Sequence, residues 1–315
     1  MILRGIDFGS VWDASGVRGF FGEGYWYHKW LKPIGLSFKG STFVAKTTTF
    51  LPRKGNMELA EDGLSPKRRR PDCIVVKVRH GAALNAVGLS GPGAEALFAD
   101  GRWQARTEPF FLSFMAVGDT LAKRLDELNG FMRLFEKRRA EFRAPVGLQI
   151  NLSCPNAGRD FKEIEHEGVM TLAHAASLGI PLVPKFSAAT PVDVAARIAR
   201  HPACDAVCVS NTIPWARVPA ADRIELFGSL DSPLAAYGGG GLSGAPLFPI
   251  VRAWMLRAAA FGFPKPINAG GGILRPADAR TLIELGAASI FVGSAAFLRP
   301  WRVRSIIRAA KDAKT

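Results

Sequence analysis

Short runs of apolar residues recur along the chain, and most are followed by a longer stretch whose apolar residues have helical spacing. The runs that predict buried strands are 43–46, 110–117, 146–151, 181–185, 206–211, 266–268 and 289–292. The stretches that predict helices are 121–135, a segment opening at 190, 243–261, 276–285 and a basic segment at the C-terminal end. A repeated strand-then-helix order predicts a parallel sheet with helices packed against it.

About eight such units in 315 residues predict a (β/α)8 TIM barrel, and we expect one domain over residues 1–315. A doubly wound sheet is the alternative. No GxGxxG motif stands at the first strand–helix turn, which weakens a dinucleotide-binding interpretation. Three residues predict helix boundaries: Thr120 as an N-cap, Pro191 at a first helical position and Gly262 as a stop.

Polar residues stand at the ends of several predicted strands. These residues are Lys46, Asn151, Lys185 and Asn211. In a barrel the carboxyl ends of the strands meet on one face, which is where the active sites of such barrels lie. Any one of these side chains could be a surface lysine or a turn asparagine. As a set they predict a site that lysine ammonium and amide groups line.

The run Asn151-Leu152-Ser153-Cys154-Pro155-Asn156 continues the predicted strand 146–151. It brings two amides, a hydroxyl and a thiol to one small volume. Amides can hold a planar polar ligand, and a thiol with a lowered pKa can act as a base or a nucleophile. The alternative is a strand end in which Cys154 is a small buried apolar residue.

Glycines follow the last two predicted strands, as Gly270-Gly271-Gly272 and as Gly293-Ser294. Glycine allows close approach to the backbone, and exposed backbone N–H groups bind phosphate. In barrels the loops after strands seven and eight often form such a site, so we expect a phosphorylated cofactor here. The run 238–244 is also rich in glycine and could add further N–H groups.

The sequence also bears on metal binding, secretion and membrane insertion. The four cysteines show no CxxC spacing and the five histidines show no HExxH motif, so neither iron–sulfur, zinc nor other metal binding is expected. The N-terminus lacks the apolar core of a signal peptide, and no apolar run approaches the ~18 residues that a membrane span needs. We therefore expect a cytoplasmic protein with no membrane span.

The net charge of +14 is high. It is compatible with nucleic acid, an anionic membrane surface or acidic small ligands, or with a simple balance for solubility. A basic run at 66–71 has few aromatic residues interleaved, which is typical of a solvated loop and makes nucleic acid an unexpected partner.

Together these segments resemble the dihydroorotate dehydrogenase family, whose members are FMN-dependent (β/α)8 barrels. The matching pieces occur in family order over nearly the whole chain, and the Asn-x-Ser-Cys-Pro-Asn element is the most specific of them. They are 14–16, 45–47, 85–89, 151–156, Lys185, 210–212, 240–244, 270–273 and 292–294.

The resemblance assigns roles residue by residue. Cys154 is the expected catalytic base, and Lys46 is expected beside both flavin and substrate. The residues expected to hold an anionic pyrimidine are Asn85, Asn151, Asn156, Asn211 and Thr212. The residues expected to bind FMN are Ala14, Ser15, Gly16, Lys46, Lys185, Gly241, Ser243, Gly271, Gly272, Gly293 and Ser294.

The activity that the resemblance implies is oxidation of dihydroorotate to orotate in pyrimidine biosynthesis. A cysteine base matches the soluble classes of the family, and a homodimer is expected from the resemblance. The electron acceptor stays open between fumarate, a quinone and NAD through a partner subunit. The chain departs from the family pattern between residues 56 and 91, at the rim of the expected site.

Two related flavin barrels and one unrelated class are alternatives. A tRNA dihydrouridine synthase would account for the charge, but its cysteine usually follows a glycine where this chain has Ser153. A dihydropyrimidine dehydrogenase-like module usually has histidine at the position of Asn156. A basic nucleic-acid-binding protein without catalysis would carry no flavin.

Overall fold

The computed structural model describes residues 1–152 and 161–314. Within these residues, parallel strands form a central sheet in the order β3, β13, β12, β9, β8, β7, β6. Their bounds are β3 (Val11–Asp13), β6 (Phe110–Phe114), β7 (Val146–Asn151), β8 (Leu182–Ser187), β9 (Val207–Asn211), β12 (Ile267–Gly270) and β13 (Ser289–Val292). Segment 42–48 joins the two edges, because parallel bridges connect Thr42 to Trp12 and Val44 to Phe111. The sheet is therefore closed into a TIM-barrel-like fold, as expected.

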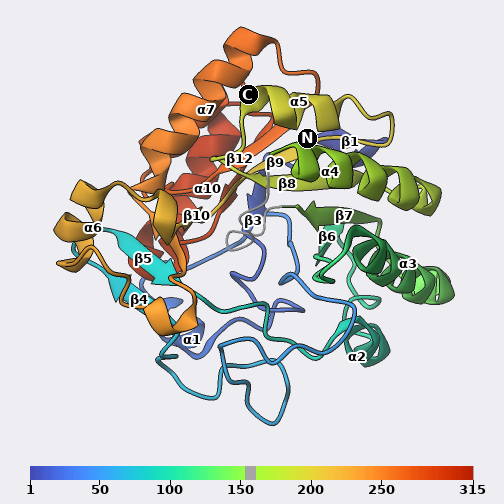
Figure 1. The fold of residues 1–315 in the computed structure, drawn as a ribbon, viewed down its shortest axis with the longest axis horizontal. Helices are drawn as coiled ribbons and strands as arrows, with labels where there is room; N and C mark the ends of the chain where they lie inside the picture. The colour runs from blue at the N-terminus through green and yellow to red at the C-terminus, as the bar shows by residue number, and fades with distance from the viewer. Residues whose placement is uncertain (153–160, 315) are drawn as a thin grey trace.

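Helices surround the barrel (Figure 1). The longer ones follow strands in the repeated pattern: α3 (Leu121–Arg138), α4 (Phe161–Ala175), α5 (Val192–Ala199), α7 (Leu247–Phe261), α8 (Pro276–Glu284) and α10 (Val303–Asp312). Shorter helices lie in the connecting loops: α1 (Trp26–Leu31), α2 (Ala94–Asp100), α6 (Ala220–Phe227) and α9 (Ala295–Leu298). No helix in the described residues is long and apolar enough to cross a bilayer.

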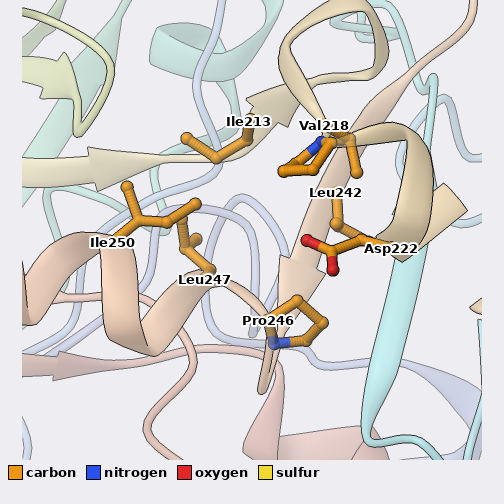
Figure 2. Close-up of a pocket in the computed structure, with 8 residues that line it drawn as sticks. Ile213, Val218, Asp222, Leu242, Pro246, Leu247 and Ile250 are labelled. Atoms are coloured by element: carbon orange, nitrogen blue, oxygen red, sulfur yellow. The ribbon is translucent and has the colours of Figure 1, made fainter.

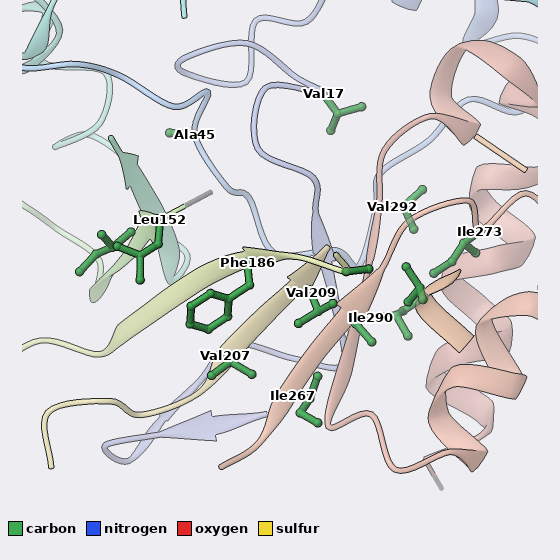
Figure 3. Close-up of a cluster of buried hydrophobic side chains, with 14 of the residues drawn as sticks. Val17, Ala45, Leu152, Phe186, Val207, Val209, Ile267, Ile273, Ile290 and Val292 are labelled. Carbon is green, nitrogen blue, oxygen red and sulfur yellow. The ribbon is translucent and has the colours of Figure 1, made fainter. Parts of the chain in front are cut away.

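Side chains alternate between the two faces of each barrel strand. One set, with Val207, Val209, Ile267 and Ile290, belongs to the large buried cluster that packs against the helices (Figure 3). The other set fills the barrel interior near the amino ends of the strands. There Phe111 lies with ring centroids 4.3 Å from both Phe8 and Trp12.

The hairpin of β1 (Ile2–Leu3) and β2 (Ile6–Asp7) leads into this interior cluster, to which Leu3 and Phe8 belong. Apolar side chains thus fill the amino-terminal half of the barrel. The polar residues lie toward the carboxyl ends of the strands, as the sequence predicts.

A second, antiparallel sheet in the order β10, β11, β5, β4 was missed by the sequence analysis. It consists of β4 (Ile74–Lys77), β5 (Ala82–Asn85), β10 (Ile213–Pro214) and β11 (Gly241–Gly244). Thr212 alone separates β10 from the carboxyl end of β9, so this sheet begins directly at the mouth of the barrel.

The predicted helix over 243–261 is wrong at its start. Ser243 belongs to β11, where it pairs with Ala83 of β5, and α7 begins at Leu247. Glycines before Ser243 disfavour a helix, and pairing with β5 satisfies the backbone there. Two other predicted boundaries are confirmed: Thr120 accepts a hydrogen bond from Lys123 N at 3.2 Å, and Gly262 ends α7 with φ +66°. The predicted position of Pro191 is wrong by one residue, because Pro191 is the N-cap of α5, with ψ 144°, and the helix begins at Val192.

Candidate active site

Four of the expected substrate residues lie around the junction of β9 and the antiparallel sheet. Asn211, at the end of β9, donates from Nδ2 to Oδ1 of Asn151, at the end of β7, over 2.7 Å. Asn85, at the end of β5, directs Nδ2 toward the carbonyl oxygen of Gly241 at 3.5 Å. Gly241 in turn packs directly against the Thr212 side chain. These contacts bring residues that are distant in sequence together, Asn151 with Asn211 and Asn85 with the Gly241 backbone.

Lys46 stands at the closing segment of the barrel and is 8% exposed. Its Nζ donates to the carbonyl oxygen of Ser90 at 2.6 Å and lies 4.5 Å from the centroid of the Phe20 ring. Burial lowers the pKa of Lys46 to about 8, against the opposing influence of Glu23. A lysine with such a pKa can carry or release its proton near neutral pH.

Lys185 lies on β8 between Asn151 of β7 and Cys208 of β9 in the strand register. It is 7% exposed, and within the described residues it makes neither a salt bridge nor a hydrogen bond through its ammonium group. Burial lowers the pKa of Lys185. Burial also raises the pKa of the neighbouring Cys208 thiol, to about 12. A buried ammonium without an anion is costly, so this position fits a ligand with a polar or anionic edge.

Residues 14–16 lie next to Lys46, with Gly16 beside the lysine side chain. The backbone N–H of Ala14 donates to Val292 O at 2.8 Å, and Ser15 Oγ donates to Ala45 O at 2.8 Å. Gly16 has φ +86°, and a Cβ at this position would meet Lys46 Cγ at 3.4 Å. A Cβ there would make only ordinary contact with the lysine, so it is the positive φ of this position that favours glycine.

The glycines after β12 and β13 approach one another from neighbouring strands. A Cβ on Gly293 would lie 2.8 Å from Ala14 Cβ, and a Cβ on Gly272 would lie 2.6 Å from Phe248 N in α7. Gly271 and Gly272 have φ +120° and +76°. Among the described residues, no acceptor pairs with the backbone N–H of Gly272 or Ser294. Ser243, on β11, instead donates from Oγ to Ala83 O at 3.2 Å.

These observations test whether the residues fit a flavin mononucleotide. Backbone N–H groups at two adjacent strand ends suit its phosphate, and the buried Lys185 ammonium, which has no hydrogen-bond or salt-bridge partner among the described residues, suits an electron-rich ring edge. The donor set fits FMN. No group of three His, Cys, Asp or Glu side chains suited to a metal occurs in the described part of the chain.

The last four residues of the cysteine motif, Ser153, Cys154, Pro155 and Asn156, lie outside the described residues. Their neighbours on the chain are placed. Leu152 N donates to Lys185 O at 3.1 Å, which continues the β7–β8 pairing up to the motif. Leu152, the last residue described before the masked part of the motif, therefore still pairs with β8.

Several residues that support the site were not found from the sequence. Tyr25 donates from its hydroxyl to Gly16 O at 2.6 Å, and Thr47 lies 2.9 Å from both Ser15 Oγ and Ser113 Oγ. No local signal marks Tyr25 or Ser113, because their partners are distant in sequence. Gln149 does carry a signal, since it is a polar residue inside an apolar strand, and its buried Oε1 has no partner within the described residues.

A small apolar pocket lies outside this site (Figure 2). It has a volume of about 10 Å3 and lies between Ile213 of β10, Leu242 of β11 and Leu247 of α7. A volume of this size holds about one water molecule. It is too small for a flavin or a pyrimidine, so it offers no competing site.

Known proteins with similar sequences and folds are dihydroorotate dehydrogenases. The dihydroorotate dehydrogenase family model matches residues 5–313. The catalytic subunit of dihydroorotate dehydrogenase B (NAD(+)) from Cutibacterium acnes is 29% identical over 94% of this chain and 86% of the relative. The same subunit from Desulforudis audaxviator is 30% identical over 92% of this chain and 83% of the relative.

Dihydroorotate dehydrogenase A (fumarate) from Lacticaseibacillus paracasei is 28% identical over 95% of this chain and 91% of the relative. The crystal structure of ligand-free dihydroorotate dehydrogenase from Eimeria tenella has a similar fold, with a TM-score of 0.64 and 19% identity over 99% of this chain and 85% of that one. With a family match over almost its full length, the chain belongs to the dihydroorotate dehydrogenase family of flavin-dependent oxidoreductases that act on a CH–CH bond in pyrimidine biosynthesis.

Proposed function

We propose that this protein binds FMN at the carboxyl-terminal mouth of its barrel and oxidises dihydroorotate to orotate. The observation that carries the proposal is that Asn151, which is hydrogen-bonded to Asn211, lies opposite Lys185 in the strand register, and that the buried Lys185 ammonium has no hydrogen-bond or salt-bridge partner among the described residues. One group suits the amide edges of a pyrimidine and the other suits the polar edge of a flavin. Family membership supports both assignments.

The residues divide between cofactor and substrate. Gly271, Gly272, Gly293 and Ser294 would hold the FMN phosphate, while Ala14, Ser15, Gly16 and Lys185 would border the ring. FMN, when bound, supplies a hydride acceptor at its N5 atom. Asn85, Asn151, Asn211 and Thr212 would orient the pyrimidine, with Asn156 as a further amide.

Cys154 would remove the proton from the carbon beside the carbonyl of dihydroorotate. Lys46, whose pKa burial lowers to about 8, would stand near the reacting edge and offset negative charge that develops there. The names of the relatives give NAD(+) for some and fumarate for another as the electron acceptor. We therefore propose no acceptor for this protein. A single domain remains an expectation from the repeated strand–helix units, and a homodimer remains one from the family resemblance.

The test is anaerobic mixing of the FMN-loaded protein with dihydroorotate, dihydrouracil or NADH, while flavin absorbance is followed. The proposal predicts rapid bleaching by dihydroorotate alone. Bleaching by dihydrouracil in its place would assign the site to a neutral pyrimidine. A protein that retains no flavin after reconstitution would contradict the proposal as a whole.

A further inference from the structure

One side of the molecule carries an unusual group of exposed apolar side chains. Trp30 of α1 is 77% exposed, Ile34 is 53% exposed and Trp301 is 51% exposed. Ile34 and Trp301 come near each other because the segment after α1 passes beside Trp301, and Trp30 precedes Ile34 by four residues. A Cβ on Gly35 would lie 3.5 Å from the Trp301 backbone. Exposed tryptophans gathered in this way mark an interaction surface.

The same chain segment continues into a basic groove. The groove has a volume of about 610 Å3 and lies between the 37–40 loop and α10. Its cations are Lys39, Arg304, Arg308 and Lys311. None of the four forms a salt bridge within the described residues. The packing of Gly40 against Lys311, with a Cβ there 3.1 Å from Lys311 Cε, ties the loop to the helix.

A further cation, Arg69, lies beside Trp26 at the start of α1. Trp26 of α1 donates from Nε1 to Arg69 O at 3.1 Å, and the Arg69 guanidinium lies 5.6 Å from its ring centroid. In the basic run, Lys67 and Arg68 pair with Glu58 and Asp72, whereas Arg69 makes no salt bridge in the described part of the chain. The basic run thereby joins the surface that the tryptophans form.

We propose that this surface, defined as Trp26, Trp30, Ile34, Trp301 and the cations of the basic groove, docks the protein on an anionic phospholipid bilayer. Tryptophan with lysine and arginine is the composition that suits the boundary between headgroups and acyl chains. The groove cations face lipid phosphates, and the apolar side chains enter the boundary layer. Because no described helix spans a bilayer, this is attachment at the surface.

The composition favours a bilayer over a nucleic acid. Ile34 offers no face for base stacking, although stacking on aromatic rings is what single-stranded nucleic acids use. An exposed aliphatic side chain gains instead by leaving water. The net charge of +14 adds a long-range attraction to any anionic lipid surface.

The test is flotation of the FMN-loaded protein with vesicles of phosphatidylcholine alone or mixed with phosphatidylglycerol. We expect binding to the mixed vesicles, little binding to phosphatidylcholine and weakening by added salt. The double variant R304E/R308E should lose about 30-fold or more in partitioning, since each cation near such a surface contributes about fivefold. The matched control R252E/R257E makes the same charge change on exposed positions of α7 and should keep most of the binding.

A second readout concerns the apolar side chains. Brominated lipid should quench tryptophan emission of the bound protein, and Trp30→Ala should reduce that quenching and weaken binding about tenfold. The matched control Phe261→Ala removes a 45% exposed ring from α7 and should change neither value. Both substituted side chains are exposed, so thermal melting should be unchanged.

Four results would overturn the proposal: absence of binding to both vesicle types, equal loss with R252E/R257E, competition by inorganic phosphate that abolishes binding, or a Trp30-dependent dimer or RNA complex in place of vesicle binding. Flavin reduction by dihydroorotate is measured on the same samples. Because neither Arg304 nor Trp30 belongs to the candidate active site, a failure of docking and a failure of the proposed activity are separate outcomes.

Discussion

Replacement of Lys46 by methionine tests how much the buried charge of this lysine lowers the free energy of unfolding. Burial lowers the pKa of Lys46 from 10.5 to about 8. This difference corresponds to roughly 3 kcal/mol of unfolding free energy that the folded state loses by holding the charged form. The side chain is 8% exposed, so screening by solvent removes little of this cost. Loss of the donor to Ser90 O would offset about 1–3 kcal/mol of the gain in Lys46→Met.

The sign of the pH dependence follows from the lowered pKa. Between pH 8 and pH 10.5 the folded state holds fewer protons at Lys46 than the unfolded state, so its stability rises with pH. The full cost is present below pH 8 and disappears above pH 10.5. From pH 7 to pH 9.5 the contribution of Lys46 should therefore change by about 2 kcal/mol in favour of folding.

The assay is urea unfolding of the flavin-free protein and of Lys46→Met at pH 7 and pH 9.5. Other groups titrate equally in both proteins, so the difference between the two pH dependences isolates Lys46. We expect the advantage of Lys46→Met over the unsubstituted protein to shrink by about 2 kcal/mol at the higher pH. A difference that does not change with pH would refute a buried, charged Lys46.

Four further predictions concern the site and the docking surface. Cys154→Ala should leave FMN bound but slow its reduction by dihydroorotate at least about a hundredfold in stopped flow, and an unchanged rate would reject its role as base. Gly272→Val should weaken FMN binding about tenfold or more in a fluorescence titration, because its side chain would meet Phe248 N, while Gly286→Val, with open space around a similarly positive φ, should keep normal affinity. Lys185→Met should stabilise the flavin-free protein and weaken FMN binding, and equal FMN affinity by titration would show that the buried ammonium does not face the flavin. Trp30→Ala should reduce partitioning to anionic vesicles with no change in flavin reduction, and a parallel loss of both would mean a structural defect.

The barrel was predictable because its strands are short apolar runs separated by amphipathic helices. The seven strands of the parallel sheet include six of the predicted runs, from Phe110 to Val292, and the remaining run, 43–46, contributes parallel bridges that close the barrel. Helix boundaries with a specific residue were also predictable, as at Thr120 and Gly262. In each case a local physical preference and the tertiary structure favour the same outcome.

The antiparallel sheet at the mouth was not predictable in the same way. Strand β11 is the glycine-rich segment Gly241–Gly244, which has no apolar alternation and is held by pairing with β5, about 160 residues earlier. The candidate site illustrates the same limit. That Asn151 and Asn211 lie at strand ends can be read from the sequence, but their hydrogen bond depends on the barrel bringing β7 and β9 together across β8.

The most direct measurement is an experimental structure of the protein with FMN and orotate bound. The account predicts the phosphate against Gly272 and Ser294, the ring between Gly16 and Lys185, and orotate within reach of Asn151, Asn211 and Cys154. A flavin bound elsewhere, or a Cys154 thiol directed away from the orotate, would contradict it.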